Sequence, residues 1–179
     1  AYFIQTHPDG KPAYTELMIA NPAAFVTAFT QPSEGFYIHS GVNRPKTPRD
    51  HMADYMKNRF ILPPNPKDYG VIYRCLSEAA LFPNEEWRKG LVENMIGNIA
   101  AMKSADLKIA ALENFLLIRQ EIRDADLRGA LVDLWAEAVS SKYGPDDGSQ
   151  AYLASIEPAI RRVQEKGVAN IRYEMLRRL

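Results

Sequence analysis

Three consecutive helical patterns between Asn84 and Tyr143 constrain the fold of this chain more than any other feature. In the clearest of them, large apolar residues recur at the spacing of one helix face, at Leu127, Leu131, Leu134, Trp135 and Val139. Asp124 is suited to cap the start of this helix, and Gly144 followed by Pro145 to end it. The pattern predicts an amphipathic helix over residues 124–143 in a chain that is mainly helical.

The same periodicity continues in almost every segment from Asn65 onward, and we predict an all-α fold of about six main helices. The expected helix starts are Asn65, Asn84, Ser104, Asp124 and Ser149, with a last helix after Gly167. Asn65, Ser104 and Ser149 lie 39 and 45 residues apart and would each open one of three antiparallel hairpins. This spacing resembles the repeat length of an α-solenoid, and a compact helical bundle is an equal alternative.

The N-terminal segment differs from the rest, since the first 66 residues hold nine of the twelve prolines and nine of the eighteen aromatic residues. Proline at this density interrupts long helices and central strands. We therefore divide the chain into an extended arm, residues 1–64, and a helical domain, residues 65–179. Two short helices are expected in the arm, after Asn21 and after Thr47, with an extended piece at Gly35–Val42 between them.

The aromatic residues of the arm are too apolar to remain in water, so the arm must lie against its own helices or against another protein. We predict seven of them as partner-binding anchors: Tyr2, Phe3, Tyr14, Phe25, Phe29, Phe36 and Tyr37. Gly90 and Gly97 lie seven residues apart on one predicted helix, although glycine is costly in a helix interior. We interpret them as close-packing positions in a helix contact, either within the chain or across an interface.

No catalytic, cofactor-binding or metal-binding residues are predicted. Cys75 is the only cysteine, so a Cys-based zinc site cannot be assembled within the chain, and its place among apolar residues predicts a buried thiol. The three histidines do not follow any metal-ligand spacing. Phosphate-loop, dinucleotide-binding and nucleophile-elbow motifs are also missing from the sequence.

Charge and apolar run length exclude two further classes of function. Twenty-two basic residues balance twenty-two acidic ones, which argues against a nucleic-acid binder. Apolar runs stay far below the roughly 20 residues of a transmembrane helix, so a soluble chain is expected. A single cysteine fits an intracellular reducing compartment, either the cytoplasm or the mitochondrion. The start at Ala1 is compatible with removal of an import sequence.

The leading functional hypothesis is a non-catalytic accessory subunit or adaptor that docks into a larger protein assembly through its arm and a helical face. A mitochondrial inner-membrane complex, such as a respiratory complex or the ATP synthase, would suit such a chain. One alternative is an enzyme or small-molecule binder with an aromatic pocket between arm and helices, lined by Tyr37, Tyr69, Tyr73 and Trp87. A further alternative is a helical-repeat binder of RNA or peptide.

Overall fold

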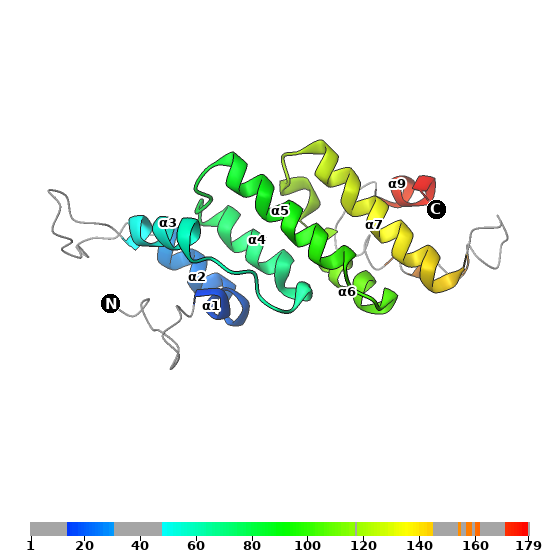
Figure 1. The fold of residues 1–179 in the computed structure, drawn as a ribbon, viewed down its shortest axis with the longest axis horizontal. Coiled ribbons are helices and arrows are strands. Elements are labelled where there is room, and N and C mark those ends of the chain that lie inside the picture. The colour runs from blue at the N-terminus through cyan, green and yellow to red at the C-terminus, as the bar shows by residue number, and fades with distance from the viewer. Residues whose placement is uncertain are drawn as a thin grey trace, which may run out of the picture. The chain divides into compact units, whose positions relative to one another are not determined.

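The computed structural model describes residues 14–30, 48–116, 118–144, 154, 157–158, 160–161 and 171–178, and the regular structure in these ranges is entirely helical (Figure 1). This confirms the predicted all-α class. The elements are α1 (Tyr14–Ala20), α2 (Pro22–Thr30), α3 (Pro48–Asn58), the 3-10 turn η1 (Pro66–Asp68), α4 (Tyr69–Glu78), α5 (Glu85–Ala100), α6 (Ala105–Leu116), the 3-10 turn η2 (Arg119–Glu121), α7 (Ala125–Tyr143) and α9 (Ile171–Arg178). The extended piece predicted at Gly35–Val42 lies outside the described residues, as does most of the helix predicted after Ser149.

The chain divides into two compact units. Unit 1 consists of Ala1–Pro64 and Val71–Arg88, and unit 2 of Asn65–Gly70 and Lys89–Leu179. This division differs from the expected one at residue 64, because Val71–Arg88 groups with the N-terminal segment. The expected arm therefore shares a compact unit with most of α4 and the start of α5.

Short polar side chains start the helices, as the sequence predicts. The Asn21 side chain accepts a hydrogen bond from the Ala24 N–H at 3.1 Å, and that of Asn84 accepts one from the Trp87 N–H at 2.7 Å. Ser104 accepts from the N–H of Leu107 at 3.4 Å, although Leu107 itself is 47% exposed rather than buried as its periodicity suggests. Gly144, at φ 93°, follows the last residue of α7.

In unit 1 the described part of the arm packs within the chain. Its aromatic residues Tyr14, Phe25 and Phe29 are buried, and the rings of Tyr14 and Tyr55 stand 4.8 Å apart, which joins α1 to α3. The buried thiol of Cys75 on α4 lies 3.8 Å from the carbonyl oxygen of Met18 on α1. The apolar side chains of the arm therefore contribute to the core of unit 1.

Helix α4 ends at Glu78, several residues before the helix-breaking Pro83. The Leu81 N–H donates to the Leu76 carbonyl at 2.9 Å and the Ala80 N–H to that of Ser77 at 3.1 Å, with Ala80 at φ 51°. These two bonds form a Schellman motif, in which the positive-φ position is usually glycine. The Arg49 guanidinium from α3 donates to the carbonyls of Ala79 and Ala80, at 2.5 and 3.2 Å, and stabilises this helix end.

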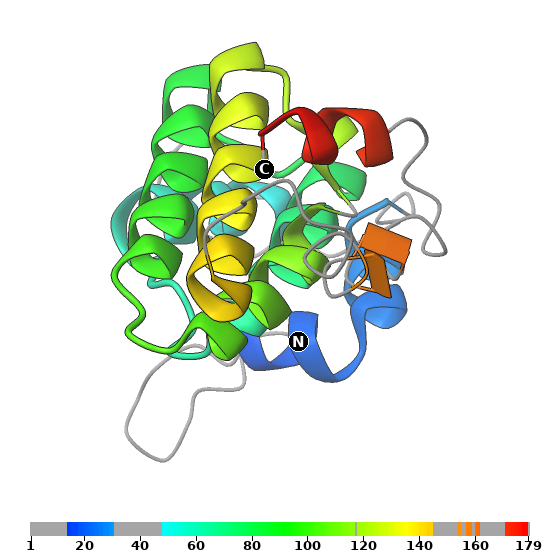
Figure 2. The same ribbon diagram turned by 90° about the vertical axis from the view of Figure 1, so that its right-hand side faces the viewer.

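In unit 2, α6 and α7 are antiparallel neighbours. Lys142 in the last turn of α7 lies 2.6 Å from Asp106 in the first turn of α6. Figure 2 shows α9 beside the N-terminal half of α7, where Arg178 pairs with Asp133. A Cβ at Gly129 would lie 3.8 Å from the guanidinium of Arg178, which is an ordinary van der Waals distance, so a methyl group would also fit there.

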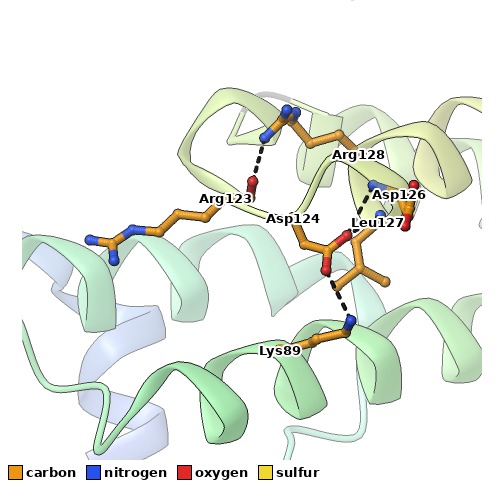
Figure 3. Close-up of polar contacts among 6 residues, drawn as sticks. All are labelled: Lys89, Arg123, Asp124, Asp126, Leu127 and Arg128. Carbon is orange, nitrogen blue, oxygen red and sulfur yellow. Dashed lines mark hydrogen bonds and ion pairs between the residues drawn. The ribbon is translucent and has the colours of Figure 1, made fainter.

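The loop before α7 is held by polar contacts drawn in Figure 3. The Asp124 carboxylate accepts from the backbone N–H groups of Asp126 and Leu127, at 2.9 and 3.1 Å, and its other oxygen lies 3.0 Å from the Lys89 ammonium of α5. The Arg128 guanidinium donates to the carbonyls of Ile122 and Arg123, at 2.6 and 2.8 Å. These groups serve to close the loop and to fix it against α5.

Close packing occurs at a different glycine from those the sequence suggests. Within the chain, a Cβ at Gly90 or Gly97 would meet no atom within 4 Å, so the expected intrachain contact is not found there. A Cβ at Gly70, in contrast, would lie 2.8 Å from the carbonyl oxygen of Asn114 on α6. The start of α4 therefore approaches α6 so closely that only glycine fits at this position.

Two glycine substitutions test this difference. We expect Gly70→Ala to lower the free energy of unfolding by about 1–3 kcal/mol, because the backbone of α6 must shift to admit the methyl group. Gly97→Ala, the matched control in an open helix position, should raise it by about 0.5–1 kcal/mol. Urea unfolding followed by circular dichroism measures both, and equal effects of the two substitutions would contradict the assignment.

The Asp124 contacts predict a pH dependence of stability. The pKa of Asp124 is lowered below its ordinary value, first by the hydrogen bond from Lys89 and then by the N–H of Leu127. Such a carboxyl group adds stability above its unfolded pKa of about 4 and loses it as pH falls through the lower folded pKa. Asp124→Asn should therefore be less stable than the wild type near neutral pH, and the difference should shrink steadily in acid below about pH 4.

Urea unfolding at a series of pH values measures this difference. Asp126→Asn is the matched control, since it removes a carboxylate from the same helix turn without breaking the hydrogen bond to Lys89. Its deficit should be the smaller of the two. If the loss of unfolding free energy in Asp124→Asn stays constant as pH falls well below 4, the charge of Asp124 does not contribute to stability.

Candidate functional site

Unit 1 carries a continuous row of aromatic side chains. Successive ring centroids are 4.8 Å apart for Tyr14 and Tyr55, 6.3 Å for Tyr55 and Phe60, 5.7 Å for Phe60 and Trp87, 6.2 Å for Trp87 and Phe82, and 5.2 Å for Phe82 and Tyr73. The three tyrosines are buried, whereas Phe60, Phe82 and Trp87 are partly exposed. The row therefore leads from the core of the unit to its surface.

The three partly exposed rings come from three different segments. Phe60 follows the end of α3, Phe82 lies in the turn between α4 and α5, and Trp87 stands in the first turn of α5. The Asn84 cap fixes that first turn through its 2.7 Å bond to the Trp87 N–H. Helix ends and short turns, rather than the apolar stripe of one helix, bring these rings together.

A buried arginine supports the row. The Arg88 side chain is buried, and its guanidinium carbon lies 4.8 Å from the ring centroid of Phe82 and 5.6 Å from that of Tyr73. Its Nε donates to the Tyr73 hydroxyl at 2.8 Å, and an Nη lies 3.7 Å from the Glu85 carboxylate. A cation over two rings and a charge-assisted hydrogen bond both favour one fixed arrangement of the aromatic side chains.

We define the aromatic patch as Phe60, Ile61, Phe82 and Trp87. Ile61 follows Phe60 in the chain and, at 71%, is the most exposed large apolar residue among those described. Exposed apolar side chains are common singly, but a group of them that includes adjoining aromatic rings is typical of a binding surface. Tryptophan and phenylalanine are also enriched at the centres of protein interfaces. The patch is suited to bind an apolar surface.

Two charged residues adjoin the aromatic patch. Arg59 precedes Phe60 and Glu86 precedes Trp87, and both side chains are exposed. Neither forms an ion pair with another residue in the described part of the chain. One exposed positive charge and one exposed negative charge are thus direct chain neighbours of the rings.

The predicted partner-binding residues of the arm are distributed differently. Tyr14, Phe25 and Phe29 are buried in the chain, so the structure gives them a role in its own packing. Tyr2, Phe3, Phe36 and Tyr37 lie outside the described residues. Of the four residues expected to line an aromatic pocket, Tyr73 and Trp87 belong to the ring row, and Tyr37 is outside the described residues. Tyr69 is in unit 2, where its hydroxyl accepts from Asn98 at 3.0 Å.

Among the patch residues, Trp87 alone was expected at a site, as one of the four residues of an aromatic pocket. Their shared signal in the sequence is a place at a helix boundary beside proline or a cap: Phe60 precedes Pro63, Phe82 precedes Pro83, and Trp87 follows Asn84. Periodicity alone assigns Trp87 to the core face of α5. The contacts of its ring with Phe60 and Phe82 arise from tertiary packing, which periodicity does not show.

Burial raises the pKa of the Cys75 thiol to about 11, so it is protonated near neutral pH. Within the described ranges, no three side chains of His, Cys, Asp or Glu are grouped so as to hold a metal ion. Among the helices of these ranges, none combines the length and apolar character needed to cross a membrane.

No family model, curated protein or solved structure matches this chain.

The support of the patch by Arg88 is testable through its acceptor. Tyr73→Phe removes a hydrogen bond to a charged donor and should lower the free energy of unfolding by about 1.5–3 kcal/mol. Tyr69→Phe on the same helix removes a hydrogen bond between neutral groups and should cost about 0.5–1.5 kcal/mol. Urea unfolding measures both, and a smaller loss for Tyr73→Phe than for Tyr69→Phe would contradict the role given to Arg88.

Proposed function

We propose that this protein is a non-catalytic helical subunit or adaptor that binds a protein partner through the aromatic patch of unit 1. The observation that carries the proposal is the contact of three partly exposed rings beside the strongly exposed Ile61. A surface of this composition favours burial against another apolar surface. The proposal places the protein in a larger assembly whose other members supply that surface.

The energetics support the patch as the principal contact. Complete burial of a large apolar side chain contributes about 1.5–3 kcal/mol relative to exposure. The rings of Phe60, Phe82 and Trp87 are already held by one another and by Arg88, so little side-chain freedom is lost when a partner covers them. The buried Tyr14, Phe25 and Phe29 cannot contribute in the same way, because their apolar surface is already removed from water.

A helical face of α5 is the proposed secondary contact. Gly90 and Gly97 are open toward the surrounding space, as their Cβ positions show. A glycine costs about 1 kcal/mol relative to alanine in a helix interior, and the described chain does not use either position for close packing. Approach of a partner's backbone to this face would explain both residues.

Comparative purification tests the proposal. A tagged wild-type chain, expressed in its native cells, should be recovered with partners at fixed stoichiometry, as shown by mass spectrometry and light scattering. Trp87→Ala should reduce the recovery of the same partners by at least about tenfold, the loss expected of a central interface tryptophan. Leu107→Ala, which truncates an exposed leucine on α6, is the matched control and should leave recovery unchanged.

Circular dichroism and thermal unfolding of both variants confirm that they are folded. Recovery of partners that is insensitive to Trp87→Ala would overturn the proposed role of the patch. Recovery of the wild-type chain alone would overturn the adaptor function itself.

A further inference from the structure

We propose that the aromatic patch pairs with the same patch of a second copy of this chain, and that two reciprocal ion pairs between Arg59 and Glu86 flank the contact. This inference rests on the proposed function, because it takes the patch to be a protein-binding surface. It names the first partner of that surface as another copy of the chain. The unit presented to larger assemblies would then be a dimer.

The argument begins with the charges beside the rings. Arg59 and Glu86 are the chain neighbours of Phe60 and Trp87, whose ring centroids are 5.7 Å apart. They come from different elements, since Arg59 follows α3 and Glu86 lies in the first turn of α5. Both are exposed, and in the described part of the chain neither has an ion-pair partner. The neighbouring Glu85 differs, because it lies 3.7 Å from Arg88 of its own chain.

Two-fold symmetry makes such an arrangement self-complementary. In an isologous contact, a residue that faces a given position on the partner is faced by that position in return. Rotation about an axis through the patch can therefore place Arg59 of each copy against Glu86 of the other. The apolar rings then meet at the centre, and these two exposed charges of each copy are neutralised at the edge.

The charge balance favours a second copy over a partner of one charge sign. A basic partner would leave Arg59 opposed by like charge, and an acidic partner would do the same to Glu86. Another copy presents one charge of each sign and so avoids both repulsions. The rings are expected to supply most of the affinity and the ion pairs to fix the orientation, since rim charges contribute more to specificity than to affinity.

Charge reversal and charge exchange test the pairing directly. The purified full-length chain is examined by sedimentation velocity and by light scattering over a wide range of concentration. The wild type should form a dimer whose population rises with concentration, and Trp87→Ala should shift it to monomer. Arg59→Glu and Glu86→Arg each place like charges opposite each other twice, so each should raise the dissociation constant at least about tenfold.

The double variant R59E/E86R is the decisive test of the ion pairs. It exchanges the two charges and restores the reciprocal pairs, so its dissociation constant should return to within about threefold of the wild-type value. Lys103→Glu, which reverses an exposed charge between α5 and α6, is the matched control and should leave the dimer unchanged. These charge variants change exposed side chains and keep the test valid if Trp87→Ala does not fold.

The outcomes separate this inference from the proposed function. A chain that stays monomeric at every concentration overturns the self-association. If Trp87→Ala still abolishes recovery of other partners, the adaptor function stands without the dimer. If the dimerisation constant is unchanged by Trp87→Ala, or is not restored in the double variant, the contact lies elsewhere and the inference is overturned.

Discussion

Closure of the helix ends is the constraint on which the rest of this structure depends. The described α-helices run from 7 residues in α1 to 19 in α7, so a large share of their backbone groups lies in first or last turns. The first four N–H groups and the last four carbonyls of a helix lack partners inside it. Asn84 and Asp124 satisfy such donors, while Arg49 satisfies the carbonyl of Ala79 from another helix and Arg128 that of Ile122 just before its own helix. These contacts determine where each helix stops and in which direction the chain continues.

The aromatic patch is a consequence of this closure. Ala80 adopts φ 51°, a conformation that costs a residue other than glycine about 1–2 kcal/mol, and thereby ends α4 abruptly. The short turn that follows carries Phe82, and the Asn84 cap then starts α5 with Trp87 in its first turn. The ring of Phe60, arriving from the end of α3, meets Trp87 at 5.7 Å. The strained end of α4 at Ala80 thus helps to place the aromatic patch at the start of α5.

The sequence predicts the helices well because their signals are local. The caps at Asn21, Asn84 and Asp124 and the end of α7 at Gly144 follow from residue type and spacing alone, and each is present in the structure. The patch could not be predicted in this way. Its rings lie outside regular apolar stripes or at their edges, and their contacts join segments that are far apart in sequence. Composition shows that aromatic residues must be buried somewhere, but not which of them remain at the surface.

The glycines illustrate the same limit. A glycine inside a helix indicates close approach, yet the sequence does not show which element approaches. At Gly70 the approaching group is the carbonyl of Asn114 on α6, so this contact depends on how α6 packs in unit 2.

 The packing of α4 against α6 is what requires glycine at position 70, and sequence periodicity does not show that packing. At Gly90 and Gly97, in contrast, a Cβ would meet no atom within 4 Å.

Burial of the described part of the arm limits the apolar surface that it can offer to a partner. The rings of Tyr14, Phe25 and Phe29 already stabilise unit 1, so their apolar surface is not available a second time to a partner. Among the described residues of unit 1, the apolar side chains that keep part of their surface in water include the rings of the patch, Ile61 and Val71. Because Arg88 and the buried Tyr73 hold Phe82 in place, the surface is ordered before binding. A preordered apolar surface with balanced charges at its edge favours association that is specific in orientation.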